Sequence, residues 1–322
     1  MNHSDRVLET VNSPQSAVYD SVSASWNRSN KKYGLDPARP PERTVVTEQE
    51  LVSRIGASER LLHVTAPKID HLFQLVGSSG CAVFLTDQDG VVIDQRCRDA
   101  DLHTFAEWGL LLGANWSEKY EGTNGIGTCL EEDRKVIIHK NQHFFPKNTA
   151  MSCIDAPIYG ADGKTIGALD VSSARLDQTQ DLNKLIGNIA AETARQIEVA
   201  NFRDVFSGFR IVLVGDTQMD QTMLIAVNSD DVVVGATRAA RKHFGWNAQG
   251  PLQPVAATDI FLRDDSLKGF EKGEKTAIIK ALTRNNGNVS ATAKALGIGR
   301  ATLYRRMDRL GLDRTISHEL SR

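Results

Sequence analysis

One segment constrains the fold more than any other part of this 322-residue chain: EKTAIIKALTRNNGNVSATAKALGIGRATLYRRMDRLGL, from Glu274 to Leu312. A helix that stops at Asn-Gly is followed by a short helix, VSATAKALG, and by a third helix, RATLYRRMDRL. Gly297 supplies the turn, because a residue without Cβ readily takes positive φ, and Ala293 is small where the last two helices must cross. This is the spacing of a helix-turn-helix. The expected apolar face consists of Leu296, Ile298, Leu303, Met307 and Leu310.

The opposite face of the third helix is basic and is the candidate nucleic-acid surface. Arginine forks match guanine edges and phosphates, and Thr and Tyr hydroxyls reach phosphates. The segment from Glu274 to Arg322 carries a net charge of +6, whereas the rest of the chain carries −8. This asymmetry favours one part for nucleic acid and another part for a different task. The expected DNA-binding residues are Ser290, Arg300, Thr302, Tyr304, Arg305, Arg306 and Arg309.

The residues NVSATAKALGIGRATLYRRM resemble the Fis-type helix-turn-helix that ends many bacterial transcriptional activators. The resemblance implies a protein that binds double-stranded DNA as a homodimer. Two recognition helices would then lie about 34 Å apart on a near-palindromic site. The alternative for the same residues is a solvated basic helical hairpin without a nucleic-acid partner.

Upstream of this tail, hairpins and one long helix predict an α+β domain. CAVFLTDQDGVVIDQ and CIDAPIYGADGKTIGALDVSS each predict a strand, an Asp-Gly turn and a second strand, and RKVIIH is a further short β-rich run. LNKLIGNIAAETARQIEVANFRDVF follows as a helix with an apolar stripe, which includes Ile186, Ile189 and Ile197. We therefore expect an antiparallel sheet flanked by helices.

The first 60 residues are expected to be helical and polar. Val18, Val22, Trp26 and Tyr33 recur at roughly helical intervals, and the three prolines of DPARPPER then interrupt the chain. TEQELVSRIGASERLLHVTAPKIDHLFQLV predicts a second helix, which Thr47 and Glu50 would begin as a capping box.

A glycine-rich loop, YEGTNGIGTC, raises the question of a phosphate cradle. A Walker A motif is excluded, because the only Gly-Lys-Thr run, at Gly163, joins two predicted strands and has Ile158 where the motif needs glycine. A dinucleotide fold is excluded as well, because the preceding LLLGANWSEKYE does not predict a strand. We interpret the loop as the wall of a cavity, in which the glycines allow the chain to bend tightly.

The run from Gly113 to Ser173 resembles the GAF sensor domain of acetoin-catabolism-type bacterial transcriptional regulators, and SWNRSNKKYGLDP matches the same family's N-terminal helix. The motif pieces are Trp116, Gly122-Thr123-Asn124, Gly127-Thr128, His143-Phe144, and Cys153 with Ala156-Pro157-Ile158. The resemblance implies a small-molecule cavity with apolar walls and a few polar contacts. The expected effector-binding residues are Trp116, Tyr120, Asn124, Ile126, His143, Phe144, Ser152 and Cys153.

Several of these side chains also fit a plain structural role. Aromatic residues such as Trp116 and Phe144 are usual in cores, and buried cysteines behave as small hydrophobes. His143 fits a structural hydrogen-bonding residue, and no second ligand pair completes a metal site from His139, His143 and Cys153. We therefore expect neither a metal nor another cofactor.

The family's usual central ATPase, which remodels sigma-N polymerase, does not fit into this chain. That domain would need about 230 residues and a Walker A motif, whereas Phe202 to Lys272 spans 71 residues. We expect a one-component, non-enzymatic regulator that acts through DNA, RNA polymerase or another activator. The alternatives are an ATPase-less partner that modulates a full-length activator, and a GAF-type thiol reductase that uses Cys129 or Cys153.

The expected domains are a helical region (1–60), a GAF sensor (61–206), a PAS-like or linker segment (207–268) and the DNA-binding tail (269–322). LIAVNSDDVVVGATRAARKHFG resembles the start of a PAS-like module, and a second sensor and a dimerisation linker both remain open. LKGFEKGEKT is expected to be a charged linker.

Composition places the chain among globular cytoplasmic proteins. It is 41% hydrophobic and 24% charged, and its N-terminus lacks the apolar region of a signal peptide. No apolar run approaches the roughly 18 residues of a membrane span, so we expect no membrane partner. Four cysteines without a Cys-x-x-Cys pair indicate a reducing compartment.

Overall fold

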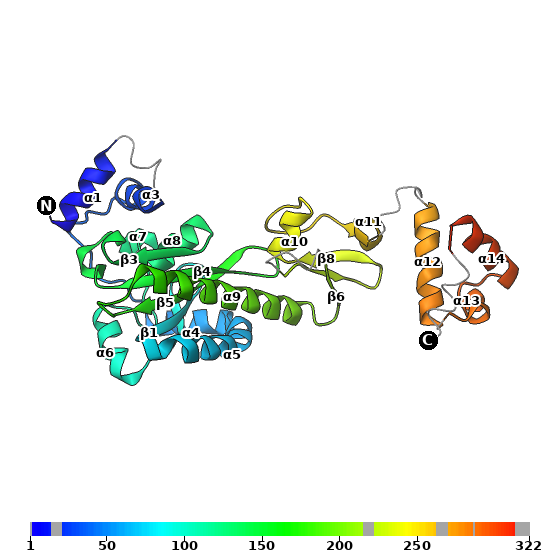
Figure 1. The fold of residues 1–322 in the computed structure, drawn as a ribbon, viewed down its shortest axis with the longest axis horizontal. Coiled ribbons are helices and arrows are strands. Elements are labelled where there is room, and N and C mark those ends of the chain that lie inside the picture. The colour runs from blue at the N-terminus through cyan, green and yellow to red at the C-terminus, as the bar shows by residue number, and fades with distance from the viewer. Residues whose placement is uncertain (1, 14–20, 215–221, 262–269, 286, 313–322) are drawn as a thin grey trace. The chain divides into compact units, whose positions relative to one another are not determined.

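The computed structural model describes residues 2–13, 21–214, 222–261, 270–285 and 287–312. They form helices and antiparallel sheet, which confirms the predicted α+β class (Figure 1). Val18 of the predicted N-terminal helix and residues 215–221 of the predicted PAS-like segment lie outside the described residues. None of the described helices combines the length and the apolar composition that crossing a bilayer requires.

A five-stranded antiparallel sheet has the order β2-β1-β5-β4-β3. Both Asp-Gly hairpins form as predicted, since β1 pairs with β2 and β4 pairs with β5. Gly90 and Gly163 take φ of 81° and 80° in the two turns, a conformation that suits glycine. The strands are β1 (Cys81–Thr86), β2 (Val92–Arg96), β3 (Val136–His139), β4 (Ser152–Tyr159) and β5 (Thr165–Ser173).

Alternation along β4 and β5 gives this sheet two different faces. Ile154, Ile158 and Val171 lie in the core formed with α5 (Glu59–Val76) and with α9 (Gln180–Val205), the predicted long helix (Figure 1). The opposite face carries Cys153 and packs against α6 (Asp99–Glu107) and α8 (Gly125–Glu132). The short helix α7 (Glu118–Glu121) precedes α8.

The N-terminal helices pack onto the α8 side of the sensor rather than forming a separate polar layer. They are α1 (His3–Asn12), α3 (Ser21–Asn27) and the π-helix η1 (Arg28–Lys32). Val7, Val11 and Trp26 share one buried cluster with Phe144 and Phe145. The predicted helical character is confirmed, but the apolar side of these helices belongs to the sensor core.

The predicted second helix is two helices. Ser58 lies between them, as the C-cap of α4 (Glu48–Ala57) and the N-cap of α5. Thr47 caps α4, because its hydroxyl accepts a hydrogen bond from the backbone N of Glu50 at 3.2 Å. The capping box is incomplete, since the Glu50 carboxylate pairs with Arg54 at 2.9 Å.

Downstream of α9, four strands form a smaller sheet with the order β6-β7-β8-β9. They are β6 (Arg210–Leu213), β7 (Leu224–Val227), β8 (Val232–Ala236) and β9 (Val255–Ala256). Two short helices lie in the same stretch of the chain, α10 (Arg238–His243) and α11 (Ala257–Phe261). The chain divides into two compact units, Met1–Ala226 with Gly235–Leu252 and Val227–Val234 with Gln253–Arg322.

The predicted charged linker is partly wrong. Helix α12 (Phe270–Arg284) begins inside LKGFEKGEKT, while residues 262–269 lie outside the described part. Glu and Lys are good helix formers, and the single Gly273 costs only about 1 kcal/mol relative to alanine. The described part of this stretch is therefore helical.

Candidate functional site

The C-terminal helices form the predicted helix-turn-helix. After α12 come α13 (Val289–Ala295) and α14 (Arg300–Arg309). Leu303 and Met307 of α14 are fully buried among apolar residues of α12, and Ala293 is 3% exposed. Gly297 has φ of 65° at the turn, and Asn288 caps α13 through a 3.0 Å bond from the backbone N of Ala291. The predicted helices, turn glycine and small crossing residue are confirmed.

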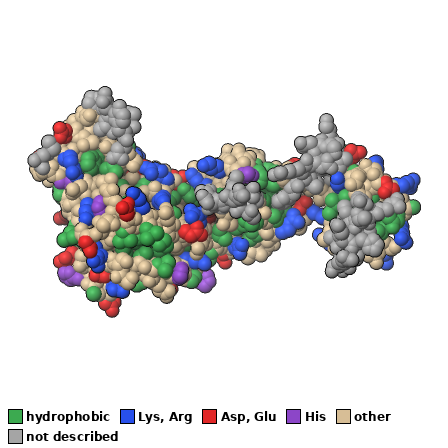
Figure 2. Space-filling model, viewed as in Figure 1, with side chains coloured by type: hydrophobic (Ala, Val, Ile, Leu, Met, Phe, Trp, Pro, Cys, Tyr) green, Lys and Arg blue, Asp and Glu red, His purple; other side chains and the backbone are tan. Residues whose placement is uncertain are grey.

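The exposed surface of α14 is basic, and Arg305 lies on the side opposite Leu303 and Met307. Arg300 and Arg305 are exposed, and within the described chain neither pairs with an acid. The guanidinium of Arg300 lies 5.7 Å from the ring centroid of the half-buried Tyr304. Lys and Arg side chains lie on the surface of this helical unit (Figure 2). The other predicted contacts of this unit are the half-buried Thr302 and, on α13, the exposed Ser290.

Arg306 and Arg309, also predicted to bind DNA, share an acidic partner. Arg306 Nη1 lies 2.9 Å from Glu274 Oε1, and Arg309 Nη2 bonds the other carboxylate oxygen. Glu274 belongs to α12, and its side chain is 20% exposed. The basic surface of α14 therefore has one part around Arg305 without an acidic partner in the described chain, and one part in which a single carboxylate offsets one of two positive charges.

The glycine-rich loop begins α8, which was not expected from the sequence. Asn124 is the N-cap, and its Oδ1 accepts a bond from the backbone N of Gly127 at 2.9 Å. Gly122 alone among these glycines takes positive φ, 61°. A Cβ on Gly125 would lie 1.9 Å from Asp155 Oδ2, and one on Gly127 would lie 2.4 Å from the backbone N of Glu118. Gly125 therefore lets α8 approach the sheet, and Gly127 lets it approach α7.

The predicted effector-binding residues lie in and around α8 and on the sheet face beneath it. Their side chains are packed against other parts of the sensor. Asn124 Nδ2 donates to the carbonyl oxygens of Trp116 and Gly122, both at 2.8 Å. Ser152 Oγ lies 2.7 Å from Nδ1 of His139. Their role toward an effector stays a prediction. Tyr120 is half-buried, and the buried members of the set are Trp116, Asn124, Ile126, His143, Phe144, Ser152 and Cys153.

The thiols and the histidine of this region are held in their neutral forms. Burial raises the pKa of Cys129 and of Cys153 well above the usual value, and burial lowers the pKa of His143 to about 4. His143 Nε2 lies 3.4 Å from Cys153 Sγ. A thiol nucleophile needs its thiolate form, so this environment disfavours the thiol-reductase alternative. In the described part of the chain, no three His, Cys, Asp or Glu side chains group to hold a metal ion.

Two carboxyl groups at the centre of the same sheet face were missed from the sequence. Asp155 of β4 and Asp170 of β5 are register partners, and both are fully buried. Burial raises the pKa of Asp170 to about 7, and burial together with the charge of Asp170 raises the pKa of Asp155 well above its usual value. The sequence does contain a signal for them: in each strand of this hairpin an Asp stands between two apolar residues, as IDA and LDV, which indicates a buried carboxyl group.

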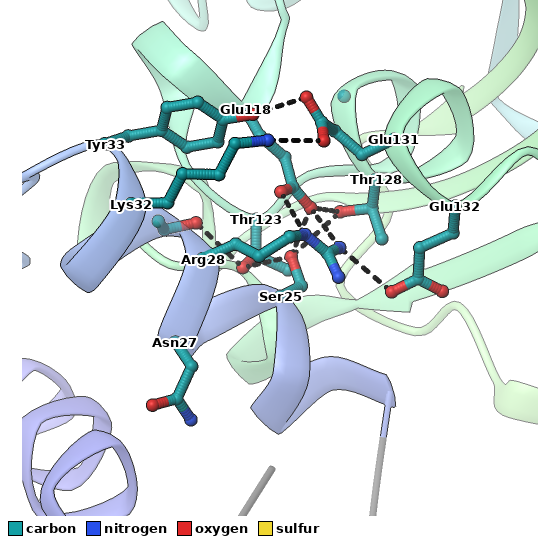
Figure 3. A network of polar contacts seen from close by, with 12 residues as sticks. Ser25, Asn27, Arg28, Lys32, Tyr33, Glu118, Thr123, Thr128, Glu131 and Glu132 are labelled. Carbon is teal, nitrogen blue, oxygen red and sulfur yellow. Dashed lines mark hydrogen bonds and ion pairs between the residues drawn. The ribbon is translucent and has the colours of Figure 1, made fainter.

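A polar network ties the N-terminal segment to α7 and α8 (Figure 3). The carboxylate of Glu118 is fully buried, and Arg28 binds it with two bonds of 2.9 Å. Thr128 of α8 donates to the same carboxylate at 2.8 Å, and Arg28 also reaches Glu132 of α8 at 2.9 Å. A buried charge of this kind is stable only while its partners stay in place. The further members of the network are Ser25, Lys32, Tyr33, Thr123 and Glu131.

Two family models match the chain, one at each end. The model described as MimR, N-terminal domain, matches residues 3–198. The model described as bacterial regulatory protein, Fis family, matches residues 270–310. The first match covers the sensor with its N-terminal helices, the second covers α12 to α14, and residues 199–269 separate them. Both resemblances stated from the sequence are confirmed, while the name GAF describes the sensor only approximately.

Curated relatives carry related names. The acetoin catabolism regulatory protein of Cupriavidus necator is 29% identical over 181 residues, which is 56% of this chain and 27% of the relative. The propane 2-monooxygenase operon transcriptional activator MimR of Mycolicibacterium smegmatis is 26% identical over 196 residues, 60% of this chain and 32% of the relative. This chain thus spans about a third or less of these relatives.

A solved structure supports the fold. The crystal structure of the E. coli DhaR(N)-DhaL complex aligns with a TM-score of 0.50 and 15% identity. The alignment covers 74% of this chain and 80% of that chain. At this level of identity the likeness concerns the fold alone.

Proposed function

The chain belongs to the family described as MimR, N-terminal domain, and from this premise we propose that it is a one-component transcriptional regulator. Its helix-turn-helix binds specific DNA as a homodimer, and a small molecule in the sensor controls that binding. The regulated genes are proposed to form a catabolic operon, in keeping with the names of the relatives.

One observation carries the DNA-binding part of this proposal: Arg305 is exposed on the side of α14 opposite its buried Leu303 and Met307. A recognition helix needs this division, because one side must hold the helix on its own unit while the other enters the major groove. Arg305 is the residue we assign to base contact, and a good bidentate contact is worth about 1–3 kcal/mol of discrimination. The remaining predicted contacts position the helix on phosphates.

Control by a small molecule is proposed for the α8 face of the sensor. An effector changes DNA binding only if it binds one form of the dimer better than the other. Helix α9 is the proposed coupler, because it packs on the sensor sheet along Ile186, Ala190 and Ile197 and is the last helix of the sensor before the C-terminal segments in the sequence. The proposal includes no ATP hydrolysis and no enzymatic reaction by this chain.

The test of DNA binding uses the full chain and a library of genomic fragments. We expect selection of a pseudo-palindromic sequence, and fluorescence anisotropy with that duplex should give log K falling linearly with log salt, by about 0.9 per phosphate neutralised. Arg305→Ala should weaken binding to the selected site at least fivefold. Arg39→Ala is the matched control, since that side chain is 88% exposed in the N-terminal part. Fragments recovered at random would refute sequence-specific binding.

A further inference from the structure

A cavity of about 420 Å³ lies where the sensor meets α10. Its walls come from the turn between α8 and β3, from β4, from α9 and from α10, all within the first compact unit. Ala191 and Ala194 of α9 are small and leave room for a ligand. The volume is in the range of small-molecule sites. None of the predicted effector-binding residues is among its described lining residues, so the cavity is distinct from the α8 face of the sensor.

The walls of this cavity carry more positive than negative side chains. Lys135 and Lys242 are exposed, and neither pairs with an acid of the described chain; Lys135 Nζ lies 3.0 Å from Asn188 Oδ1 instead. Even with the acidic partners of Arg134 and Arg195 counted, five cations face four carboxylates. This surplus attracts anions. The lining cations are Arg134, Lys135, Arg195, Arg238 and Lys242, and the lining acids are Asp133 and Glu198.

Arg238 presents an oriented guanidinium at the wall of the cavity. Its Nη2 bonds the carboxylate of Asp133, the C-cap of α8, and its Nη1 donates to the carbonyl oxygen of Gly163 at 2.9 Å. The guanidinium also lies 4.5 Å from the ring centroid of Tyr159. These two bonds leave three of the five N–H donors of the side chain for a ligand. A guanidinium that is already oriented loses little conformational entropy when it binds an oxyanion.

Glu198 adds a titratable carboxyl group to the same cavity. It accepts a hydrogen bond from the backbone N of Arg238 at 3.3 Å, and burial raises its pKa to about 7. In its protonated form it no longer repels an anion and can donate one hydrogen bond to it. The positive surplus is therefore larger below pH 7 than above it. The other titratable groups that line the cavity are Asp133, Arg134, Lys135, Tyr159, Arg195, Arg238 and Lys242.

We propose that this cavity is a second ligand site, and that it binds a small organic dianion, either a short dicarboxylate or a phosphate monoester. Both classes carry oxyanion charges, which Lys and Arg bind through charge-assisted hydrogen bonds. Lys135 belongs to the turn before β3 and Lys242 belongs to α10, so one dianion can contact both elements. The inference goes beyond the proposed function, because this site lies outside the α8 face and its occupancy is measured without DNA.

Filling the site should strengthen the contact between the sensor and α10. Arg238 already links the two elements through Asp133 and Gly163. An anion that contacts Lys135 and Lys242 adds a further link between them, and a ligand that binds only the assembled cavity stabilises it. Hydrogen exchange in α10 should therefore become slower when the dianion is bound.

Calorimetric titration of the full chain with sodium succinate and with sodium glycerol 3-phosphate, at constant ionic strength, tests the assignment. We expect saturable binding, and the tighter of the two ligands identifies the preferred oxyanion. Succinamide and 1,4-diaminobutane, which lack the negative charges, should not bind. Lys135→Gln and Lys242→Gln should each weaken binding about fivefold. Lys184→Gln is the matched control on α9, since that side chain is 70% exposed and lies outside the cavity. Thermal melts establish that each variant is folded.

Glu198→Gln provides a readout of the opposite sign. Its affinity for the dianion should nearly equal that of the wild type at pH 6 and should exceed it about fivefold at pH 8, where the wild-type carboxylate is ionised. Comparing the two proteins at each pH cancels the titration of the ligand itself. Equal affinities at pH 8 would contradict a carboxylate that faces the bound anion.

The assignment is overturned if neither dianion binds saturably, or if succinamide binds as tightly as succinate. It is also overturned if Lys184→Gln weakens binding as much as the two cavity variants do, because attraction to the general surface charge would then explain the binding. Exchange in α10 that stays unchanged at saturating ligand would rule out the link between α10 and the sensor. A chain that binds the dianion but selects no DNA sequence would keep this site and refute the proposed regulator.

Discussion

Replacing Asp170 by asparagine should change how the stability of the sensor responds to pH. Burial raises the pKa of Asp170 from 3.8 to about 7, so between these values the folded protein binds a proton that the unfolded chain lacks. The free energy of unfolding contributed by this group is therefore present at low pH and is lost as the pH rises through 7. Asparagine has no proton to lose, so the variant lacks the decline that Asp170 contributes, while the buried Asp155, whose pKa burial also raises, keeps its own.

The expected size follows from the distance between the two pKa values. Each pH unit between 5 and 7 is worth about 1.4 kcal/mol, so the loss by pH 8 is on the order of 2–3 kcal/mol. His143 acts in the opposite direction, because burial lowers its pKa to about 4 and the unfolded chain takes up the proton below pH 6.5. The informative quantity is therefore the stability of Asp170→Asn minus that of the wild type, in which the contribution of His143 cancels.

Urea unfolding between pH 5 and pH 8, followed by tryptophan fluorescence, measures this difference. Trp116 is 2% exposed in the sensor core and reports on its unfolding. The difference should rise by about 2–3 kcal/mol in favour of the variant from pH 5 to pH 8. Asp181→Asn is the control, since that side chain is 91% exposed and its difference should stay flat. A flat curve for Asp170→Asn would refute the buried, proton-binding carboxyl.

Three further outcomes are expected. Gly125→Ala should destabilise the sensor by about 1–3 kcal/mol in urea unfolding, because the added Cβ would meet Asp155. Gly56→Ala is the control and should stabilise by about 0.5–1 kcal/mol, because nothing lies within 4 Å of its added Cβ. Equal effects of the two substitutions would contradict the close approach of α8. Arg28→Ala should lower the free energy of unfolding by about 3–5 kcal/mol, because it leaves the buried Glu118 carboxylate without its cationic partner. Hydrogen exchange in α3 and α8 should become faster. Unchanged exchange would show that the network does not hold the N-terminal segment on α8. Glu274→Gln should increase DNA affinity, because Arg306 and Arg309 could then contact up to two further phosphates. The slope of log K against log salt, measured by anisotropy, should steepen by up to about 1.8. A slope like that of the wild type would mean that these two arginines do not reach DNA.

Local patterns were enough to predict the elements whose residues determine their own conformation. The Asp-Gly turns at Gly90 and Gly163, the long helix α9 and the three C-terminal helices follow from turn chemistry and apolar spacing. The start of α8 was missed because its glycines suggest a loop. These residues form a helix because Asn124 caps its first turn. Position 125 is glycine because the sheet beneath leaves no room for a side chain.

Long-range pairing explains most of what the sequence did not reveal. Asp155 and Asp170 lie fifteen positions apart, and only the register of β4 with β5 makes them neighbours. The partnership of Arg28 with Glu118 joins segments whose docking depends on burying Trp26 and Val11, and no local pattern encodes this. The same holds for Glu274, whose position near Arg306 and Arg309 follows from how α12 and α14 pack. These residues became candidates only when their neighbours were known.

Glu274 gives the proposed recognition helix a built-in counterion. A genome offers about 10⁶–10⁹ competing non-specific sites that share the same sugar-phosphate backbone. On the proposed function, a carboxylate that already pairs with two arginines would weaken attraction to all of those sites alike, while the base contact assigned to Arg305 would be left intact. A single acidic side chain on α12 would then keep the protein from being held by non-specific DNA and leave more of it free to search for its own site.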